Sequence, residues 1–438
     1  MKRLIPAASI AVIVWLLGPV SGAAQAPSMA WVTHGIAAEG QPAVAATFSA
    51  TRPASAQPDL TSSKTIVVGS VSSFTITATF DSSITTNPNA VALENAIATA
   101  IADYPATFSD NINVAITFKT MSSGLGQSST AYFPNYPYAT FLSALKSTSS
   151  SADDSTAYSL LPDSSTNPVN GSSALGIKTA NLRAVGLAAS ASPDGTISIN
   201  TMLTSPGSPG TSGQYDMISV LQHEIDEVLG TGSVLPSSGA PFPADLFRYN
   251  GSGARSFAVS PSAPAFLSLD GTTRIVQFNN VNNGGDAGDW ISNAPAQVQD
   301  AFATAGSHPR LGTSEIVNLD VVGYDRVGAN GFTDNTLTAG VTTIKAVHIN
   351  ELRTRIQAQR ARFGLGAFSY STPTITASTT TVKASVISEL RQALAEAYSA
   401  GGFGVPTYTD SALTAGTTTI KAVHITELRA AVVSLEAR

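Results

Sequence analysis

The alternation of apolar and polar residues along the chain predicts a domain of mixed strands and helices. Residues 74–80 alternate with a period of two, as in a half-buried β-strand, and residues 112–118 predict a second strand. Between them, residues 90–102 form a long Ala-, Ile- and Leu-rich helical pattern, with Asn87 or Asn89 as its cap. A strand, a long helix and a second strand predict a right-handed crossover between parallel strands.

Further along, residues 138–146 predict a helix, the Ser-, Asn- and Asp-rich residues 148–175 a loop, and residues 195–200 another strand. That strand is either the free edge of the sheet, where its backbone pairs with an extended substrate, or an ordinary internal strand. A helix follows over residues 215–229 and ends before a glycine. We therefore expect an α+β fold over residues 65–327, in which a twisted sheet carries this helix.

A 38-residue repeat occupies residues 330–438. Lys345, Lys383 and Lys421 mark the same position in three units, at intervals of 38 residues (383 − 345 and 421 − 383). Each unit is a Thr-rich lead followed by an amphipathic helix, so we expect a small all-α module of three helices.

Two histidines of the repeat have the spacing of metal ligands on a helix. His348 and His424 precede Glu351 and Glu427 by three positions. The middle unit has Val386 at the corresponding place, so the repeat does not depend on histidine. We therefore favour surface or interface histidines over a metal site.

The first residues of the chain predict secretion. Residues 1–26 have a basic start, an apolar run and then small residues, which is the pattern of a signal peptide, with an uncleaved anchor as the alternative. No later stretch is apolar enough to span a bilayer. Residues 27–64, rich in Ala, Ser, Thr and Pro, predict a linker or a short propeptide. His34 within it is either a ligand that masks a metal or, as we favour, an ordinary polar residue.

Composition narrows the chemistry that the chain can perform. The net charge is −6 and only 12% of residues are charged, so the clustered Lys and Arg that nucleic-acid binding needs are missing. The 438 residues include no Cys, which excludes disulfides, thiolate metal ligands and a Cys nucleophile. A transition-metal site must therefore use Asp, Glu or some of the five His.

The expected helix over residues 215–229 carries a candidate metal site. Its sequence His-Glu-Ile-Asp-Glu places His223 and Glu227 four positions apart, about 40° around the helix, so that both can bind one ion. Glu224 projects about 100° away, within reach of a water molecule on that ion. The pattern is H-E-x-x-E and differs from the usual H-E-x-x-H of zinc proteases. An amphipathic surface helix without metal is the alternative, which the apolar flanks and the scarcity of His disfavour.

A hydrolytic zinc site needs a third protein ligand. Asp245 is the first acid after the helix and our choice; Asp286, Asp289 and His308 are the other candidates, and Asp245 could instead cap a turn. Asp286 and Asp289 lie in a Gly-rich turn that could also bind Ca²⁺, although Asx turns and tight bends explain the turn equally well.

Five blocks in order resemble a group of secreted bacterial metzincin-like metalloproteases. They are His-Glu-Ile-x-Glu-Val-Leu-Gly (223–230), Asp-Leu-Phe-Arg-Tyr (245–249), Ser-Leu-Asp-Gly (268–271), Gly-Asp-x-Gly-Asp-Trp (285–290) and Leu-Asp-Val-Val-Gly-Tyr (319–324). The resemblance covers roughly residues 66–326. It implies a zinc endopeptidase fold with His223, Glu224 and Glu227 in the active site.

Two positions depart from the metzincin pattern. Ser233 stands where the third zinc ligand is expected, and no Met follows Met217, so the methionine turn under the metal is missing. The C-terminal repeats resemble modules appended to secreted bacterial hydrolases.

The sequence thus predicts a secreted zinc-dependent endopeptidase that acts on protein or peptide substrates, with His223, Glu227 and Asp245 as metal ligands and Glu224 as general base. The alternative is a non-catalytic extracellular protein on a protease-like fold that contacts a cell surface or a polymer through its repeats. A different metal-dependent hydrolase, acting on glycans, is a third reading.

Overall fold

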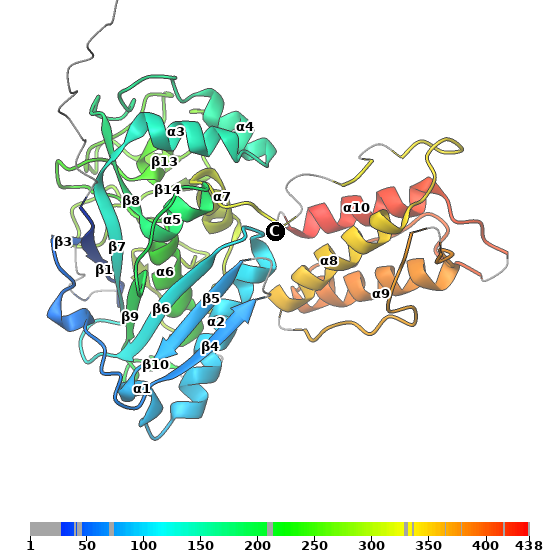
Figure 1. The fold of residues 1–438 in the computed structure, drawn as a ribbon, viewed down its shortest axis with the longest axis horizontal. Coiled ribbons are helices and arrows are strands. Elements are labelled where there is room, and N and C mark those ends of the chain that lie inside the picture. The colour runs from blue at the N-terminus through cyan, green and yellow to red at the C-terminus, as the bar shows by residue number, and fades with distance from the viewer. Residues whose placement is uncertain are drawn as a thin grey trace, which may run out of the picture.

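A computed structural model of the chain describes residues 28–436, apart from 39–40, 42–45, 70–73, 208–212, 328–331, 335–336, 364, 378 and 415–416. The expected signal peptide lies outside these residues. The fold is α+β, as predicted: a mixed sheet with helices packed against it, followed by a bundle of three long helices (Figure 1). In the part of the chain described, no helix is long and apolar enough to cross a bilayer.

The central sheet has the strand order β3-β1-β7-β9-β6-β5-β4, with β8 paired to β7. Its strands are β1 (Ala30–His34), β3 (Thr47–Ser49), β4 (Lys64–Gly69), β5 (Thr75–Phe80), β6 (Asn113–Thr120), β7 (Gly126–Pro137), β8 (Ala174–Lys178) and β9 (Gly195–Ile199). Strands β5 and β6 are parallel and are joined by the long helix α2 (Ala90–Thr107), which confirms the expected crossover. Strand β7 runs antiparallel to both β9 and β1.

Of the two readings of residues 195–200, the structure shows the internal strand. Strand β9 lies between β6 and β7 and has no free edge for a substrate. The outer edge of β7 is covered by β1 along Ala30–His34, and β3 pairs with β1 in turn. Residues that were expected to form a linker or propeptide therefore belong to the folded sheet. Their pairing with β7 joins segments about a hundred positions apart, and no local pattern announces it.

The helix that carries the candidate site packs beneath this sheet. Helix α6 (Met217–Leu229) contacts β7 and β9 on one side and α2 on the other (Figure 1). The remaining helices of this unit are α1 (Ser82–Thr85), α3 (Tyr138–Ser147), α4 (Ala152–Ser159), α5 (Thr179–Ala184) and α7 (Thr313–Val321), with 3-10 turns at Ala54–Ala56 and Pro243–Phe247. Helix α4 falls in a region expected to be loop. It forms because Ser151 and Asp154 make a capping box at its start.

The chain between α6 and α7 is mostly loop. Its short strands are β12 (Arg248–Asn250), β13 (Ala265–Leu267), β14 (Val276–Gln277) and β15 (Phe302–Ala303). Strand β15 pairs with β2 (Ala37–Ala38) near the N-terminus. Before α6, the short strands β10 (Thr204–Ser205) and β11 (Tyr215–Asp216) pair with each other. Trp290 anchors this region, because it is fully buried and its indole N–H donates to Glu315 at the start of α7.

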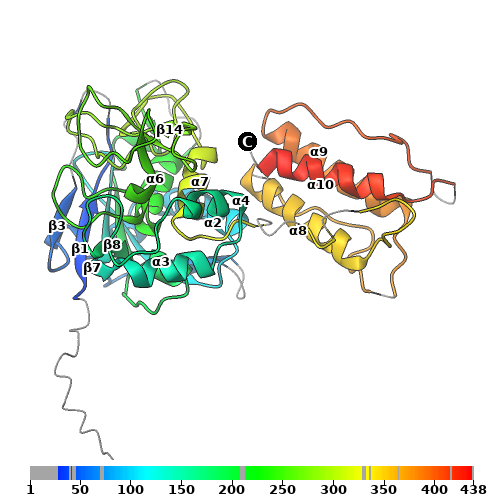
Figure 2. The same cartoon turned by 90° about the horizontal axis from the view of Figure 1, so that it is seen from above.

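The repeats form helices α8 (Ala346–Arg362), α9 (Ala384–Ala400) and α10 (Ala422–Glu436), which lie beside the larger unit, with α8 against α2 (Figures 1 and 2). One arginine of each helix reaches the turn of another repeat and closes a ring. The pairs are Arg353 with Tyr370 and the Pro373 carbonyl, Arg391 with Tyr408 and the Asp410 carbonyl, and Arg429 with Phe332 and the Asp334 carbonyl.

The two repeat histidines are buried, and each contacts an aspartate of the turns that the arginines reach. The His348 imidazole contacts Asp334 at 2.9 Å, and the His424 imidazole contacts Asp410 at 3.0 Å. Each histidine is thus an internal residue with a single carboxylate partner, neither a surface residue nor a member of a group of metal ligands.

Candidate metal centre

Helix α6 is short and strongly defined at both ends. The Asp216 side chain accepts a hydrogen bond from the Ser219 backbone at its start, and Gly230, at φ 158°, ends it. His223, Glu224 and Glu227 are all fully buried. The Nε2 atom of His223 lies 3.5 Å from Oε1 of Glu227, so the two side chains expected to bind a metal do converge.

The other nitrogen of His223 fixes the state of the ring. Its Nδ1 lies 3.0 Å from the backbone carbonyl of Val298, and a carbonyl can only accept, so Nδ1 carries the hydrogen. The other ring nitrogen, Nε2, faces Glu227. Histidines that bind metals are commonly held by such a bond to a carbonyl or a carboxylate. Nothing in the sequence around Val298 indicated this role.

Glu224 lies beneath the sheet. Its Oε1 accepts a hydrogen bond of 3.3 Å from the Ile36 backbone N–H. A Cβ at position 126 would lie 2.7 Å from the same oxygen, so glycine there lets the backbone of β7 pass over the carboxylate. Burial and then the charge of Glu227 raise the pKa of Glu224 well above its usual range.

Glu227 sits in a dense polar environment. The Ser128 hydroxyl of β7 donates to its Oε2 at 2.6 Å. Burial alone would raise the pKa of Glu227, but His34 and His223 hold it at about 2. The Lys178 ammonium donates to the backbone carbonyls of Glu227 and Thr231, and so satisfies the C-terminal end of the helix. Burial lowers the pKa of Lys178 to about 8.

Two acids reach the site from the Gly-rich turn at residues 284–290. Asp289 places Oδ2 3.8 Å from Nε2 of His223, and its Oδ1 accepts from the Gln299 amide at 2.8 Å. Asp286 places Oδ2 2.5 Å from Nδ1 of His34, and its Oδ1 accepts from the Gly288 backbone at 2.7 Å. The two acids therefore face two different histidines, an arrangement unlike a shared calcium cage.

Asp245, the third ligand expected from the sequence, has another role. Its Oδ1 accepts from the Ser233 hydroxyl at 2.6 Å, and its Oδ2 accepts from the Phe242 backbone at 2.8 Å. Both oxygens thus hold the turn that follows α6, which is the alternative considered above. His308 also lies elsewhere, 3.1 Å from Asp216 at the start of the helix.

Within the described residues, two groups of side chains could hold a metal ion. Ligand atoms of His223, Glu224 and Glu227 lie within 4.8 Å of one another, and so do those of His34, Glu227 and Asp286. Glu227 belongs to both. The sequence identified the first group and offered His34 only as a masking ligand, the reading it did not favour. It missed Ser128, which stands in no recognisable motif.

The site is rich in buried acids. Glu224, Glu227, Asp286 and Asp289 are all buried, and the charge of each acts on the buried Lys178. Buried carboxylates are stable in their charged form only when a cation or hydrogen bonds offset that charge. A divalent metal ion would offset the charge of these carboxylates.

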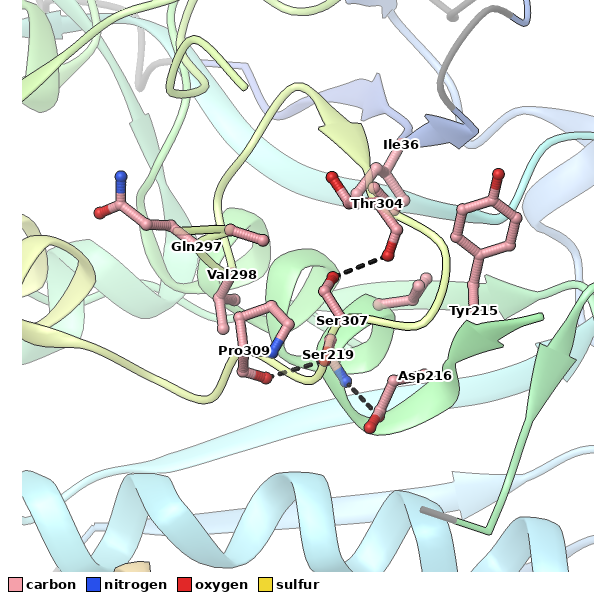
Figure 3. Close-up of a pocket in the computed structure, with 12 residues that line it drawn as sticks. Ile36, Tyr215, Asp216, Ser219, Gln297, Val298, Thr304, Ser307 and Pro309 are labelled. Atoms are coloured by element: carbon pink, nitrogen blue, oxygen red, sulfur yellow. Dashed lines mark hydrogen bonds between the residues drawn. The ribbon is translucent and has the colours of Figure 1, made fainter. Parts of the chain in front are cut away.

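A narrow pocket lies beside the centre (Figure 3). Its lining includes Ile36 and Val298, whose backbone atoms contact Glu224 and His223, together with Tyr215, Ser219, Val220 and Pro309.

No family model, curated protein or solved structure matches the chain.

Proposed function

We propose that this chain is a secreted zinc-dependent endopeptidase with a metzincin-like catalytic domain. His223 and Glu227 bind the zinc ion, and Glu224 is the general base. The observation that carries the proposal is the pairing of Nε2 of His223 with the Glu227 carboxylate one helical turn away, with Glu224 beside them. The locked ring of His223 and the buried carboxylates of the site support it.

Zinc, when bound, supplies a Lewis acid that polarises a carbonyl and acidifies water. Glu224 takes the proton from the attacking water and passes it to the nitrogen of the departing amine. The hydrogen bond from Ile36 supports this role, because it shows that the Glu224 carboxylate lies within reach of a peptide nitrogen. A carboxylate at position 227 in place of an imidazole lowers the charge of the site, so we expect weaker activity or a more alkaline pH optimum than in the Glu227→His variant.

The second candidate is an extracellular binding protein that uses the protease-like fold as a scaffold and attaches through its repeats. The full burial of His223, Glu224 and Glu227 favours this alternative, because a substrate needs access to those groups.

The test uses the secreted chain, purified and supplied with zinc. The substrate is an unstructured protein that carries a fluorescent label. Endopeptidase activity that a chelator abolishes, that zinc restores and that Glu224→Gln lacks would support the proposal. Glu224→Gln keeps the size and the hydrogen bond to Ile36, so its zinc content should match that of the parent. If the parent chain does not bind about one equivalent of zinc, the endopeptidase proposal is rejected and the non-catalytic binding protein remains as the candidate.

A further inference from the structure

The N-terminal strand brings a second imidazole to the candidate centre. His34 is fully buried and pairs across the β1–β7 ladder with Ser128. Side chains that are directly opposite in a ladder lie on the same face of the sheet. The Ser128 hydroxyl donates to Glu227, and an oxygen of Glu227 lies within 4.8 Å of a ring nitrogen of His34. His34 and Ser128 therefore face the same carboxylate.

The ring of His34 is held in the way that prepares a histidine to bind a metal. Asp286 lies 2.5 Å from Nδ1, and a carboxylate accepts, so the hydrogen sits on Nδ1. The other ring nitrogen, Nε2, is buried and has no hydrogen-bond partner among the described residues. A buried polar atom without a partner is costly unless it binds something. A carboxylate, a histidine and an ion in line are a recurring arrangement in zinc sites.

We propose that Nε2 of His34 is the third protein ligand of the zinc ion, together with His223 and Glu227; this rests on the metal site of the proposed function. Two imidazoles and one carboxylate form a common ligand set for catalytic zinc. Glu227 belongs to both groups of candidate ligands, so it is the carboxylate that the two imidazoles share. Asp286 orients His34 and is not itself a ligand.

Asp289 is the competing residue. Its Oδ2 lies 3.8 Å from Nε2 of His223 and also has no hydrogen-bond partner within the described ranges. Asp289 belongs to neither group of candidate ligands among the described residues, however, whereas His34 shares a group with Glu227. We therefore assign Asp289 to the charge balance around His223.

The assignment makes strand β1 part of the metal centre. Removal of the chain before residue 39 would then remove a ligand, so residues 27–38 cannot be a propeptide that is discarded on activation. This reverses the role expected for this segment from its composition.

The experiment compares zinc affinity, by competition with a chromophoric chelator, in the secreted chain and in its His34→Ala, Asp286→Asn and Asp289→Asn variants. Loss of an orienting partner costs about 10–100-fold in metal affinity, and loss of a ligand costs no less. We expect His34→Ala to weaken zinc binding by at least about 100-fold, Asp286→Asn by about 10–100-fold and Asp289→Asn by less than about tenfold. Unchanged affinity in His34→Ala, or a larger loss in Asp289→Asn, would overturn the assignment.

A second measurement avoids the variants and any folding defect. The chain has five histidines, so ¹⁵N-labelled His gives a spectrum that can be assigned. Zinc should shift Nε2 of His34 and of His223 together; a His34 signal that does not respond would refute the proposal. If proteolysis depends on Glu224 but the His34 signal does not respond to zinc, the assignment of His34 as a ligand is refuted and the endopeptidase proposal stands. Zinc bound by His34 without proteolysis would refute the endopeptidase alone, and a chain that binds no zinc would refute both.

Discussion

Substitution of Gly126 by Ala tests the closest contact between the sheet and the proposed general base. A Cβ at this position would lie 2.7 Å from Oε1 of Glu224 and 2.6 Å from Cγ1 of Val220. Ordinary van der Waals contact begins near 3.4 Å, so either the carboxylate or the strand must move by roughly 0.7 Å.

The size of the effect follows from this displacement. A misplacement of about 1 Å at a catalytic group costs about 100-fold in rate, so we expect kcat to fall by about 10–100-fold. Overpacking of a buried site costs about 1–3 kcal/mol, of which the lower chain entropy of Ala in the unfolded state returns about 0.4–1 kcal/mol. The melting temperature of the larger unit should therefore drop by a few degrees, at about 2–4 °C for each kcal/mol.

The assay measures kcat on a peptide substrate, zinc affinity and thermal unfolding for Gly126→Ala, with Gly207→Ala as the matched control. No atom of the described residues lies within 4 Å of a Cβ at position 207, so the control should change none of the three quantities. Zinc affinity of Gly126→Ala should stay near that of the parent, because Glu224 is not a ligand. Parental activity together with parental stability would show that β7 does not lie against Glu224, and the placement of the general base would be wrong.

Two other variants separate structural acids from functional ones. Asp245→Asn keeps one oxygen for two donors, so we expect about 1–3 kcal/mol of lost stability in denaturant unfolding with unchanged zinc affinity; a large loss of zinc would restore Asp245 as a ligand. Burial, and then the charge of Asp325, raise the pKa of Asp110 to about 8. The folded state therefore keeps a proton that the unfolded carboxyl loses near pH ~4. As a result, the stability of the fold decreases as the pH rises from ~4 to ~8. Asp110→Asn should therefore be neutral at pH ~4 and stabilising by about 1–3 kcal/mol at pH ~8, and equal unfolding curves at both pH values would contradict the raised pKa.

Local patterns were sufficient for elements whose stability is decided within a short window. The boundaries of α6 follow from Asp216 and Gly230, and the three repeat helices follow from the periodicity of the repeat. On the helix, geometry alone brings His223 and Glu227 to one side, and the structure shows the convergence. These features need no knowledge of the rest of the fold.

The rest of the site depends on pairings between distant segments. Whether β9 is an edge or an internal strand depends on β7, which reverses direction and joins its free side. His34 reaches the centre only because β1 joins the opposite side of β7. We preferred Asp245 as a ligand because it is the first acid after the helix. In the structure its side chain instead accepts a hydrogen bond from the Ser233 hydroxyl, within the turn that follows α6. Sequence distance from the helix therefore did not reveal His34 and Asp286, whose ligand atoms lie near Glu227.

The arrangement explains why a short helix motif is not sufficient to identify the centre. Helix α6 supplies His223, Glu224 and Glu227, and strand β7 orients Glu227 through Ser128. The turn before Trp290 places Asp286 against His34 and Asp289 3.8 Å from His223. Each contributing group is buried, and each would cost stability in isolation. Because an ion that binds only the folded state stabilises it, zinc should raise the stability of β1 and the turn together with that of α6. The β1–β7 ladder already joins the N-terminal strand to the sheet, and a metal ion on His34 and Glu227 would strengthen this connection.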